Sequence, residues 1–218
     1  MAERSSTVVK RVAIIGAGAL GQQIAQHLNQ AAGWQAIGFF DDFAIAGTVT
    51  GQGCVLGKTA DAEAAYTNGQ VDGFLMGIGY NHLVFRQQIF ERLAAKVPFV
   101  TFVHPSAYVD KSAVIEVGCF ISPACVIDLN VVVGPNTFLY SGCILSHDTH
   151  LLGHSFLAPA VRLAGCVVVD TGCFLGIGTT VIDDLKVGPN VRTGASTTVV
   201  RSLEIPGTYV GTPALKLG

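Results

Sequence analysis

Between positions 109 and 199, an apolar or β-branched residue returns every six positions. This period fits neither an amphipathic helix nor an alternating strand. It is typical of hexapeptide-repeat β-helices, in which each repeat supplies one short side of a triangular coil. We therefore predict an all-β, left-handed parallel β-helix. The series is Val109, Ile115, Ile121, Ile127, Val133, Leu139, Leu145, Leu151, Leu157, Leu163, Val169, Leu175, Val181, Val187, Thr193 and Val199.

The same register predicts which side chains fill the coils. Counting the periodic residue as the first position of each hexapeptide, the fifth position favours small or β-branched residues, which we expect to point inward. Cysteines at this position are expected to act as buried fillers in a reducing cytoplasm, without disulfides. No insertion interrupts the register, so we expect no loop extruded from a coil. These cysteines are Cys119, Cys125, Cys143 and Cys173.

The first hundred residues carry a different pattern, in which buried strands alternate with helices. This alternation predicts an α/β domain with a small, Rossmann-like parallel sheet of three or four strands. The expected domains are residues 1–103 and 104–218, with Pro105 starting the connection into the coils. The predicted strands span residues 11–15, 34–40, 71–76 and 98–103, and a helix is expected over residues 83–95.

A glycine-rich turn, Gly16-Ala17-Gly18-Ala19-Leu20-Gly21, follows the first predicted strand and opens a helix. The second strand ends in Asp41-Asp42, at the separation expected for an acid that contacts a ribose or base. Glycines let the backbone approach a phosphate, and a helix N-terminus offers free N–H groups. The turn therefore predicts nucleotide or nucleotide-sugar binding, and a purely structural turn is the alternative. The sheet lacks the second half that a whole dinucleotide requires.

Composition and net charge limit the classes of binding partner that we expect for this protein. The formal net charge of −2 leaves no basic footprint for nucleic acid. No apolar stretch approaches the roughly 20 residues that span a bilayer, so no membrane partner is expected. Half of the residues are hydrophobic, and this surplus is expected to cover a subunit interface or the coil interior.

Three of the six histidines fall within eight positions, at His147, His150 and His154. The register gives His147 the third position of its repeat, on an outward corner, followed by Asp148. Gly165, one coil later, is expected to leave open space beside the ring. A neutral imidazole beside a carboxylate suits a general base near pH 7, whereas polar turn residues without a role are the alternative.

The whole chain, from about residue 10 to residue 215, resembles the bacterial hexapeptide-repeat sugar acyltransferases of the sialic acid O-acetyltransferase and nucleotide-amino-sugar N-acetyltransferase family. The resemblance rests on motifs in both predicted domains. They are Gly16-Ala17-Gly18, Asp41-Asp42, Gly77-Ile78-Gly79-Tyr80-Asn81, His104-Pro105, the hexapeptides with His147-Asp148, and Tyr209-Val210-Gly211-Thr212-Pro213-Ala214.

The resemblance implies a cytoplasmic homotrimer that transfers an acetyl group from acetyl-CoA to a sugar amine or hydroxyl, without a covalent intermediate or a metal. It implies that His147 is the general base and that Asp148 supports it. It assigns the nucleotide or sugar end of the acceptor to the first domain. The implied acceptor contacts are Gly16, Ala17, Gly18, Asp41 and Asp42, and the implied CoA contacts are Gly176, Ile177, Gly194, Ala195 and Pro213.

Some family members carry a second histidine nine residues after the base, where this chain has Phe156. The carbonyl-polarising role of that histidine is therefore in doubt, and the roles of His150 and His154 stay open. Two other functions remain: a γ-carbonic-anhydrase-like enzyme with zinc on His147, His150 and His154, and a non-catalytic trimeric scaffold that binds a nucleotide sugar. The acceptor, N- versus O-acylation and the acyl group itself stay undetermined.

Overall fold

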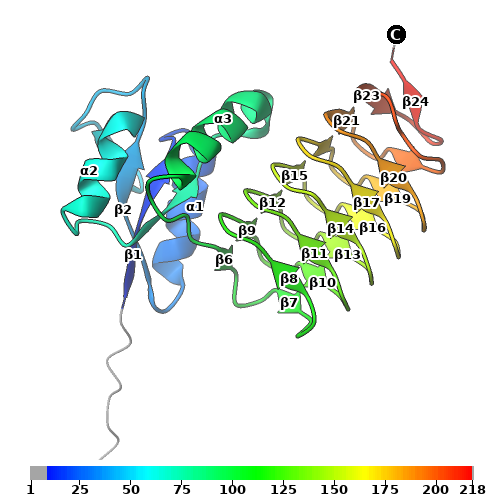
Figure 1. The fold of residues 1–218 in the computed structure, drawn as a ribbon, viewed down its shortest axis with the longest axis horizontal. Coiled ribbons are helices and arrows are strands. Elements are labelled where there is room, and N and C mark those ends of the chain that lie inside the picture. Colours follow the sequence, from blue (N-terminus) through cyan, green and yellow to red (C-terminus); the bar gives the residue numbers. More distant parts are fainter. Residues whose placement is uncertain (1–8, 218) are drawn as a thin grey trace, which may run out of the picture. The chain divides into compact units, whose positions relative to one another are not determined.

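The computed structural model describes residues 9–217 of the chain (Figure 1). These residues divide into two compact units. The first unit holds residues 9–79 together with Phe90–Val100, and the second holds Tyr80–Ile89 together with residues 101–217. The outer ends of the two predicted domains, residues 1 and 218, lie outside the described residues.

The first unit is an α/β domain built on a five-stranded sheet with the strand order β3-β4-β2-β1-β5. Strand β1 runs parallel to both β2 and β5, β2 runs parallel to β4, and β3 and β4 form an antiparallel hairpin. The strands are β1 (Lys10–Ile15), β2 (Trp34–Phe40), β3 (Val49–Thr50), β4 (Gly53–Gly57) and β5 (Gly73–Met76). The helices are α1 (Ala19–Gln30), η1 (Thr59–Asp61) and α2 (Ala62–Thr67), and Phe90–Val100 contributes the later part of α3 (Leu83–Ala94).

The predicted α/β class is confirmed, but the sheet is larger than expected. The hairpin β3–β4 and helix α2 were not predicted, because strands of two and five residues and a helix of six residues carry little periodicity. The prediction of one strand over residues 98–103 is wrong. Phe99 makes only an isolated bridge to Phe74 within the first unit, and Phe102–Val103 (β6) pairs with a strand of the second unit's own coils.

The second unit is the left-handed parallel β-helix that the hexapeptide period predicts. Its short strands pair with strands three places further along the chain, so three sheets rise in parallel (Figure 1). The sheet with β6 also contains β9 (Phe120–Ile121), β12 (Phe138–Leu139), β15 (Phe156–Leu157), β18 (Phe174–Leu175), β21 (Val191–Thr193) and the terminal β23 (Gly207–Val210) and β24 (Leu215–Lys216). The second sheet contains β7 (Tyr108–Val109), β10 (Val126–Ile127), β13 (Ile144–Leu145), β16 (Arg162–Leu163), β19 (Thr180–Val181) and β22 (Thr198–Val199). The third contains β8 (Val114–Ile115), β11 (Val132–Val133), β14 (His150–Leu151), β17 (Val168–Val169) and β20 (Lys186–Val187).

The interior of the coils matches the predicted register. The periodic aliphatic residues from Ile121 onward are fully or almost fully buried, and the four fifth-position cysteines are buried with them as free thiols. Thr193 is the polar exception in the periodic series. Its hydroxyl lies 2.7 Å from Thr179 Oγ1 and accepts a hydrogen bond from the Gly176 N–H, so it is satisfied in the core.

The corners depend on a left-handed backbone at the fourth position of most repeats. Asn130, Asp148, Cys166 and Asp184 form one such column with φ between 56° and 59°, each residue one coil beyond the last. Non-glycine residues adopt this conformation uncommonly, and they do so here at regular intervals. The corner conformation therefore follows from the repeat, and it fixes which side chains face solvent.

A column of five phenylalanines runs up the first coil sheet. Phe102, Phe120, Phe138, Phe156 and Phe174 occupy the sixth position of successive coils and are buried or half-buried. The rings of Phe120 and Phe138 stack at 5.0 Å between centroids, and those of Phe138 and Phe156 stack at 4.8 Å. Offset aromatic contacts of this kind stabilise adjacent layers beyond simple area burial.

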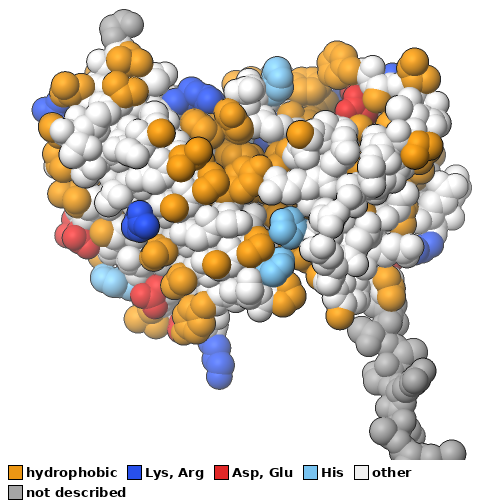
Figure 2. All heavy atoms as spheres, turned by 180° about the vertical axis from the view of Figure 1, so that it is seen from behind, with side chains coloured by type: hydrophobic (Ala, Val, Ile, Leu, Met, Phe, Trp, Pro, Cys, Tyr) orange, Lys and Arg blue, Asp and Glu red, His pale blue; other side chains and the backbone are white. Residues whose placement is uncertain are grey.

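Charged side chains do not gather in one place on the face that Figure 2 shows. On the face in Figure 2, Lys, Arg, Asp and Glu side chains are scattered in small groups among hydrophobic and uncharged surface. That face offers no extended basic stripe of the kind that nucleic acid binding requires. Among the described residues, no helix combines the length and the apolar character needed to cross a membrane.

Replacing Phe138 by alanine tests the phenylalanine column. We expect Phe138→Ala to lower the free energy of unfolding by roughly 3–5 kcal/mol, because it removes a fully buried ring between two stacked neighbours. Urea denaturation of the full chain, with the protein concentration held constant, measures this free energy. Val117→Ala, at an exposed turn, is the control and should cost less than about 0.5 kcal/mol. A cost below about 1 kcal/mol for Phe138→Ala would contradict a stabilising column.

Candidate active site

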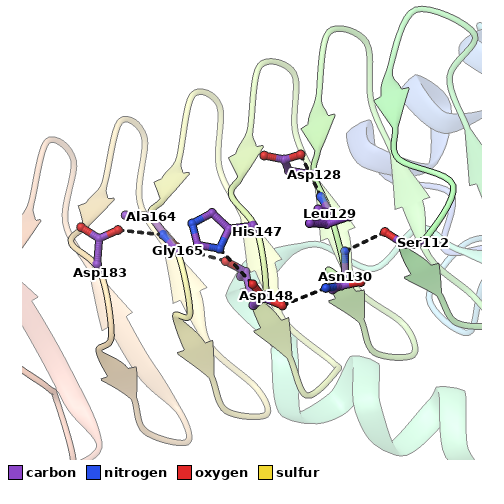
Figure 3. Close-up of polar contacts among 10 residues, drawn as sticks. Ser112, Asp128, Leu129, Asn130, His147, Asp148, Ala164, Gly165 and Asp183 are labelled. Atoms are coloured by element: carbon purple, nitrogen blue, oxygen red, sulfur yellow. Dashed lines mark hydrogen bonds and ion pairs between the residues drawn. The ribbon is translucent and has the colours of Figure 1, made fainter.

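His147 lies on the corner that follows strand β13, with about half of its side chain exposed (Figure 3). Its Nδ1 lies 2.9 Å from Asp148 Oδ2. The third position of the repeat points this side chain outward, as the register predicts, and the left-handed conformation of Asp148 turns the next side chain back beside it. The corner thus presents an exposed imidazole already paired with a carboxylate.

The prediction of open space at Gly165 is wrong. The imidazole itself occupies that space, because a methyl group added at Gly165 would lie 2.6 Å from both Cε1 and Nε2 of His147 (Figure 3). Only a glycine one coil later lets the ring lie flat over the backbone. Gly165 therefore positions the imidazole, whose other side faces solvent.

Further polar contacts hold this corner from the neighbouring coils (Figure 3). The side-chain amide of Asn130 donates to Asp148 Oδ1 at 3.1 Å, and the N–H of Gly165 donates to Asp183 Oδ1 at 3.0 Å. The backbone of Asn130 in turn donates to Ser112 Oγ at 2.9 Å. Hydrogen bonds between neighbouring coils thus orient the groups of this corner, and the second oxygen of Asp148 remains available to the imidazole.

Electrostatics favour the protonated form of this histidine. The hydrogen bond to Asp148 raises the pKa of His147 above its ordinary value, and the charges of Asp148, Asp128 and Asp183 add to the effect while partial desolvation opposes it. In return, the hydrogen bonds from His147 and Asn130 lower the pKa of Asp148. The pair therefore combines a basic imidazole with an ionised carboxylate at neutral pH.

The other predicted histidines do not join His147. His150 points outward from strand β14, and His154 Nδ1 lies 3.1 Å from Asn136 Nδ2 at a different corner of the coil. Among the described residues, these three histidines do not come together as ligands within one chain. Phe156 is buried in the phenylalanine column, where its ring stacks on that of Phe138.

The glycine-rich turn of the first unit is explained largely by close packing. A side chain at Gly21 would collide with the carbonyl oxygen of Gly16, and one at Gly77 would lie 2.8 Å from that same oxygen. Gly18, by contrast, has nothing within 4 Å of its missing side chain, so it faces open space at the start of α1. Close packing thus requires glycine at positions 21 and 77, and Gly18 is the position that a ligand could approach.

The two aspartates after β2 are partly engaged within the first unit. Asp41 Oδ2 accepts a hydrogen bond from the Ala17 N–H at 2.8 Å, which brings the acid to the glycine-rich turn. Partial burial works to raise the pKa of Asp41, but hydrogen bonds from the N–H groups of Ala17, Phe43 and Ala44 outweigh it and lower the pKa. Asp42 accepts hydrogen bonds from the N–H and hydroxyl of Thr59. Both acids order the surrounding loops.

The predicted CoA contacts gather at another corner of the coils. A side chain at Gly176 would lie 2.6 Å from the carbonyl oxygen of Gly194, one coil later, while Ile177 beside it is 58% exposed. The Thr212 hydroxyl, next to Pro213, donates to the Ser196 carbonyl and brings the C-terminal segment there. This corner precedes the strands of the six-stranded sheet, whereas the corner of His147 follows them. The two corners therefore lie at opposite ends of those strands, and one chain does not bring them together.

The segment Tyr80–Ile89 was missed as part of the second unit. Tyr80 stacks on Phe174 at 4.6 Å between ring centroids, and Arg86 is 1% exposed, with its pKa lowered to about 9 by burial. Arg192 lies over the other side of this cluster, 4.6 Å from the Phe174 ring, and its Nη1 donates to the Tyr80 carbonyl. The phenylalanines repeated at the coil length were the sequence signal that could have predicted this aromatic contact between Tyr80 and the coils.

A cavity of about 460 Å³ opens beside this segment, within the second unit. Asn81, His82 and Gln88 line one wall, and Asn190 and Arg192 of the coils line the other. One guanidinium and several amides in an open cavity suit a polar, anionic group.

Residues 11–93 match the model of the PglD N-terminal domain family. The whole chain is similar to the crystal structure of a perosamine N-acetyltransferase variant from Caulobacter crescentus in complex with CoA and GDP-perosamine. That structure is 25% identical with a TM-score of 0.89, over 96% of this chain and 98% of the other.

A second similar structure is the acetyltransferase domain of PglB from Neisseria gonorrhoeae in complex with acetyl coenzyme A. It is 26% identical, with a TM-score of 0.83 over 96% of this chain and 100% of that domain. WeeI from Acinetobacter baumannii shares the fold at 19% identity. The resemblance to the nucleotide-amino-sugar acetyltransferases of the hexapeptide-repeat family is thereby confirmed, and the chain is an acyltransferase.

Titration of His147 by NMR tests the electrostatics of the corner. We expect the pKa of His147 to lie above the ordinary value of 6.5, and Asp148→Asn to lower it, because the substitution removes the charge that stabilises the imidazolium. At pH 7 the variant then holds more neutral imidazole than the wild type. The remaining histidine resonances provide internal references. An unchanged pKa in Asp148→Asn would refute the pairing.

Proposed function

We propose that the protein transfers an acetyl group from acetyl-CoA to the amine of a nucleotide-linked sugar. The observation that carries the proposal is the His147–Asp148 pair on an exposed coil corner. It occurs in a chain that matches, over 96% of its length, an N-acetyltransferase in complex with CoA and GDP-perosamine. Because this match covers both units, we assign the acceptor to the first domain and the acyl donor to the coils.

His147 acts as the general base in this proposal. Asp148 Oδ2 accepts a hydrogen bond from the Nδ1–H group, which leaves Nε2 as the basic nitrogen. The acceptor amine attacks the thioester carbonyl, and Nε2 removes its proton as the new C–N bond forms. The intermediate then collapses, the C–S bond breaks, and the proton passes to the departing thiolate of CoA. The attack is direct, so no acyl-enzyme forms.

The acyl donor is assigned to the corner around Gly176, Ile177, Gly194, Ala195 and Pro213. Glycines there let the CoA arm lie close to the backbone, and exposed Ile177 offers apolar contact. Because one chain holds this corner and His147 at opposite ends of the strands of one sheet, the proposal includes a homotrimer in which neighbouring subunits complete each site. Exposed apolar residues on that sheet support a subunit interface: Tyr108, Val126 and Ile144.

The acceptor's nucleotide is assigned to the glycine-rich turn and the acids of the first unit. Gly18 offers the open approach at the start of α1, where backbone N–H groups suit a phosphate. Asp41 and Asp42 each accept hydrogen bonds already, but a carboxylate oxygen has two lone pairs, so each retains capacity for a ribose or base. The N–H of Ala17 donates to Asp41, so Ala17 stabilises the conformation of the glycine-rich turn.

The test is His147→Ala, assayed with acetyl-CoA and nucleotide-linked amino sugars by release of the CoA thiol. Removal of a general base should lower kcat by roughly 10²–10⁴-fold while the KM for acetyl-CoA changes little. His150→Ala, an exposed histidine three residues away, is the matched control and should retain activity. Wild-type turnover by His147→Ala would exclude His147 as the base.

A further inference from the structure

Cys166 is an exposed thiol beside the His147–Asp148 pair. It occupies the fourth position of its repeat, whereas the buried coil cysteines occupy the fifth. It stands one coil beyond Asp148 at the same left-handed corner, with φ values of 58° and 57°, so the two side chains lie in one column. A nitrogen of His147, an oxygen of Asp148 and the sulfur of Cys166 all lie within 4.8 Å of one another.

These three donors match the ligands of a thiophilic divalent cation. Zinc binds thiolate at about 2.3 Å, imidazole at about 2.0–2.1 Å and carboxylate at about 2.0–2.2 Å, and sites open to exchange use three protein ligands with a fourth position free. Magnesium and calcium prefer oxygen ligands alone. Since all three side chains lie at the surface, modest side-chain rotations would close them around an ion that enters from solvent.

The surroundings of the cluster also favour a cation. Asn130 holds Asp148 Oδ1 at 3.1 Å and so orients this carboxylate while leaving its second oxygen toward the imidazole. The charges of Asp128 and Asp183 act on His147. Partial desolvation and the charges of Asp184 and Asp183 raise the pKa of the Cys166 thiol, so this thiol loses its proton to solvent when a cation binds. Ordered outer partners and surrounding negative charge both strengthen a metal site.

We propose that His147, Asp148 and Cys166 form an inhibitory binding site for a thiophilic divalent cation such as Zn²⁺. The bound ion takes the lone pair of the imidazole and the charge of the carboxylate, so it removes the base from the reaction. The metal is an inhibitor in this scheme and has no part in acetyl transfer. The inhibition rests on the proposed function, whereas the binding does not.

Cadmium is the probe, because a Cd²⁺–thiolate bond gives an ultraviolet charge-transfer band that reports binding without any assay of activity. The wild-type full chain should develop this band on titration with Cd²⁺. Cys166→Ser should lose the band and bind Cd²⁺ at least about tenfold more weakly. Cys54→Ser, which removes the half-exposed cysteine of hairpin β3–β4, is the matched control and should keep the band.

Zinc should inhibit the wild type reversibly, with activity restored by a chelator, while Cys166→Ser keeps its basal activity and resists inhibition at the same Zn²⁺ concentration. A band that persists in Cys166→Ser, or equal zinc inhibition of both proteins, would overturn the proposal. A Cys166-dependent band without inhibition would confirm that Cys166 binds the cation and would overturn the inhibition.

Discussion

The hydrogen-bonded stacking of one coil on the next is the constraint on which the second unit depends. Each short strand pairs with the strand three places further along, and the chain can satisfy this pairing only if each coil has the same length. The repeated left-handed residues at the corners keep that length constant. A residue's position in its hexapeptide therefore determines whether its side chain fills the interior, stacks along a sheet or faces solvent.

The candidate site is a direct consequence of this constraint. His147 and Asp148 occupy neighbouring corner positions, and Gly165 lies one coil later, beneath the ring. Asn130 and Cys166 stand one coil before and one coil after Asp148, in the same column. The site is thus assembled from equivalent positions of successive coils, although the residues are far apart in sequence. The same property makes it sensitive to any insertion in the repeat.

The hexapeptide period allowed the coils, the buried cysteines and the outward corner of His147 to be predicted, because the six-residue pattern is itself the packing pattern. Side-chain placement between coils was harder. The register identified Gly165 as the neighbour of His147, but not that the ring would lie over it. The phenylalanine column recurs at the coil length, yet its role in seating Tyr80 depends on tertiary packing. In the first unit, the engagement of Ala17 by Asp41 follows from loop geometry that no local pattern encodes.

Direct acetyl transfer to a nucleotide-linked amino sugar can be tested by one kinetic measurement. Initial rates of CoA thiol release test it most directly, with acetyl-CoA and a panel of GDP-, UDP- and dTDP-linked amino sugars beside the matching free sugars. We predict release with at least one nucleotide-linked amine, a product heavier by one acetyl group, and double-reciprocal lines that intersect. Parallel lines, release only with free sugars, or no release with any member of the panel would contradict the account.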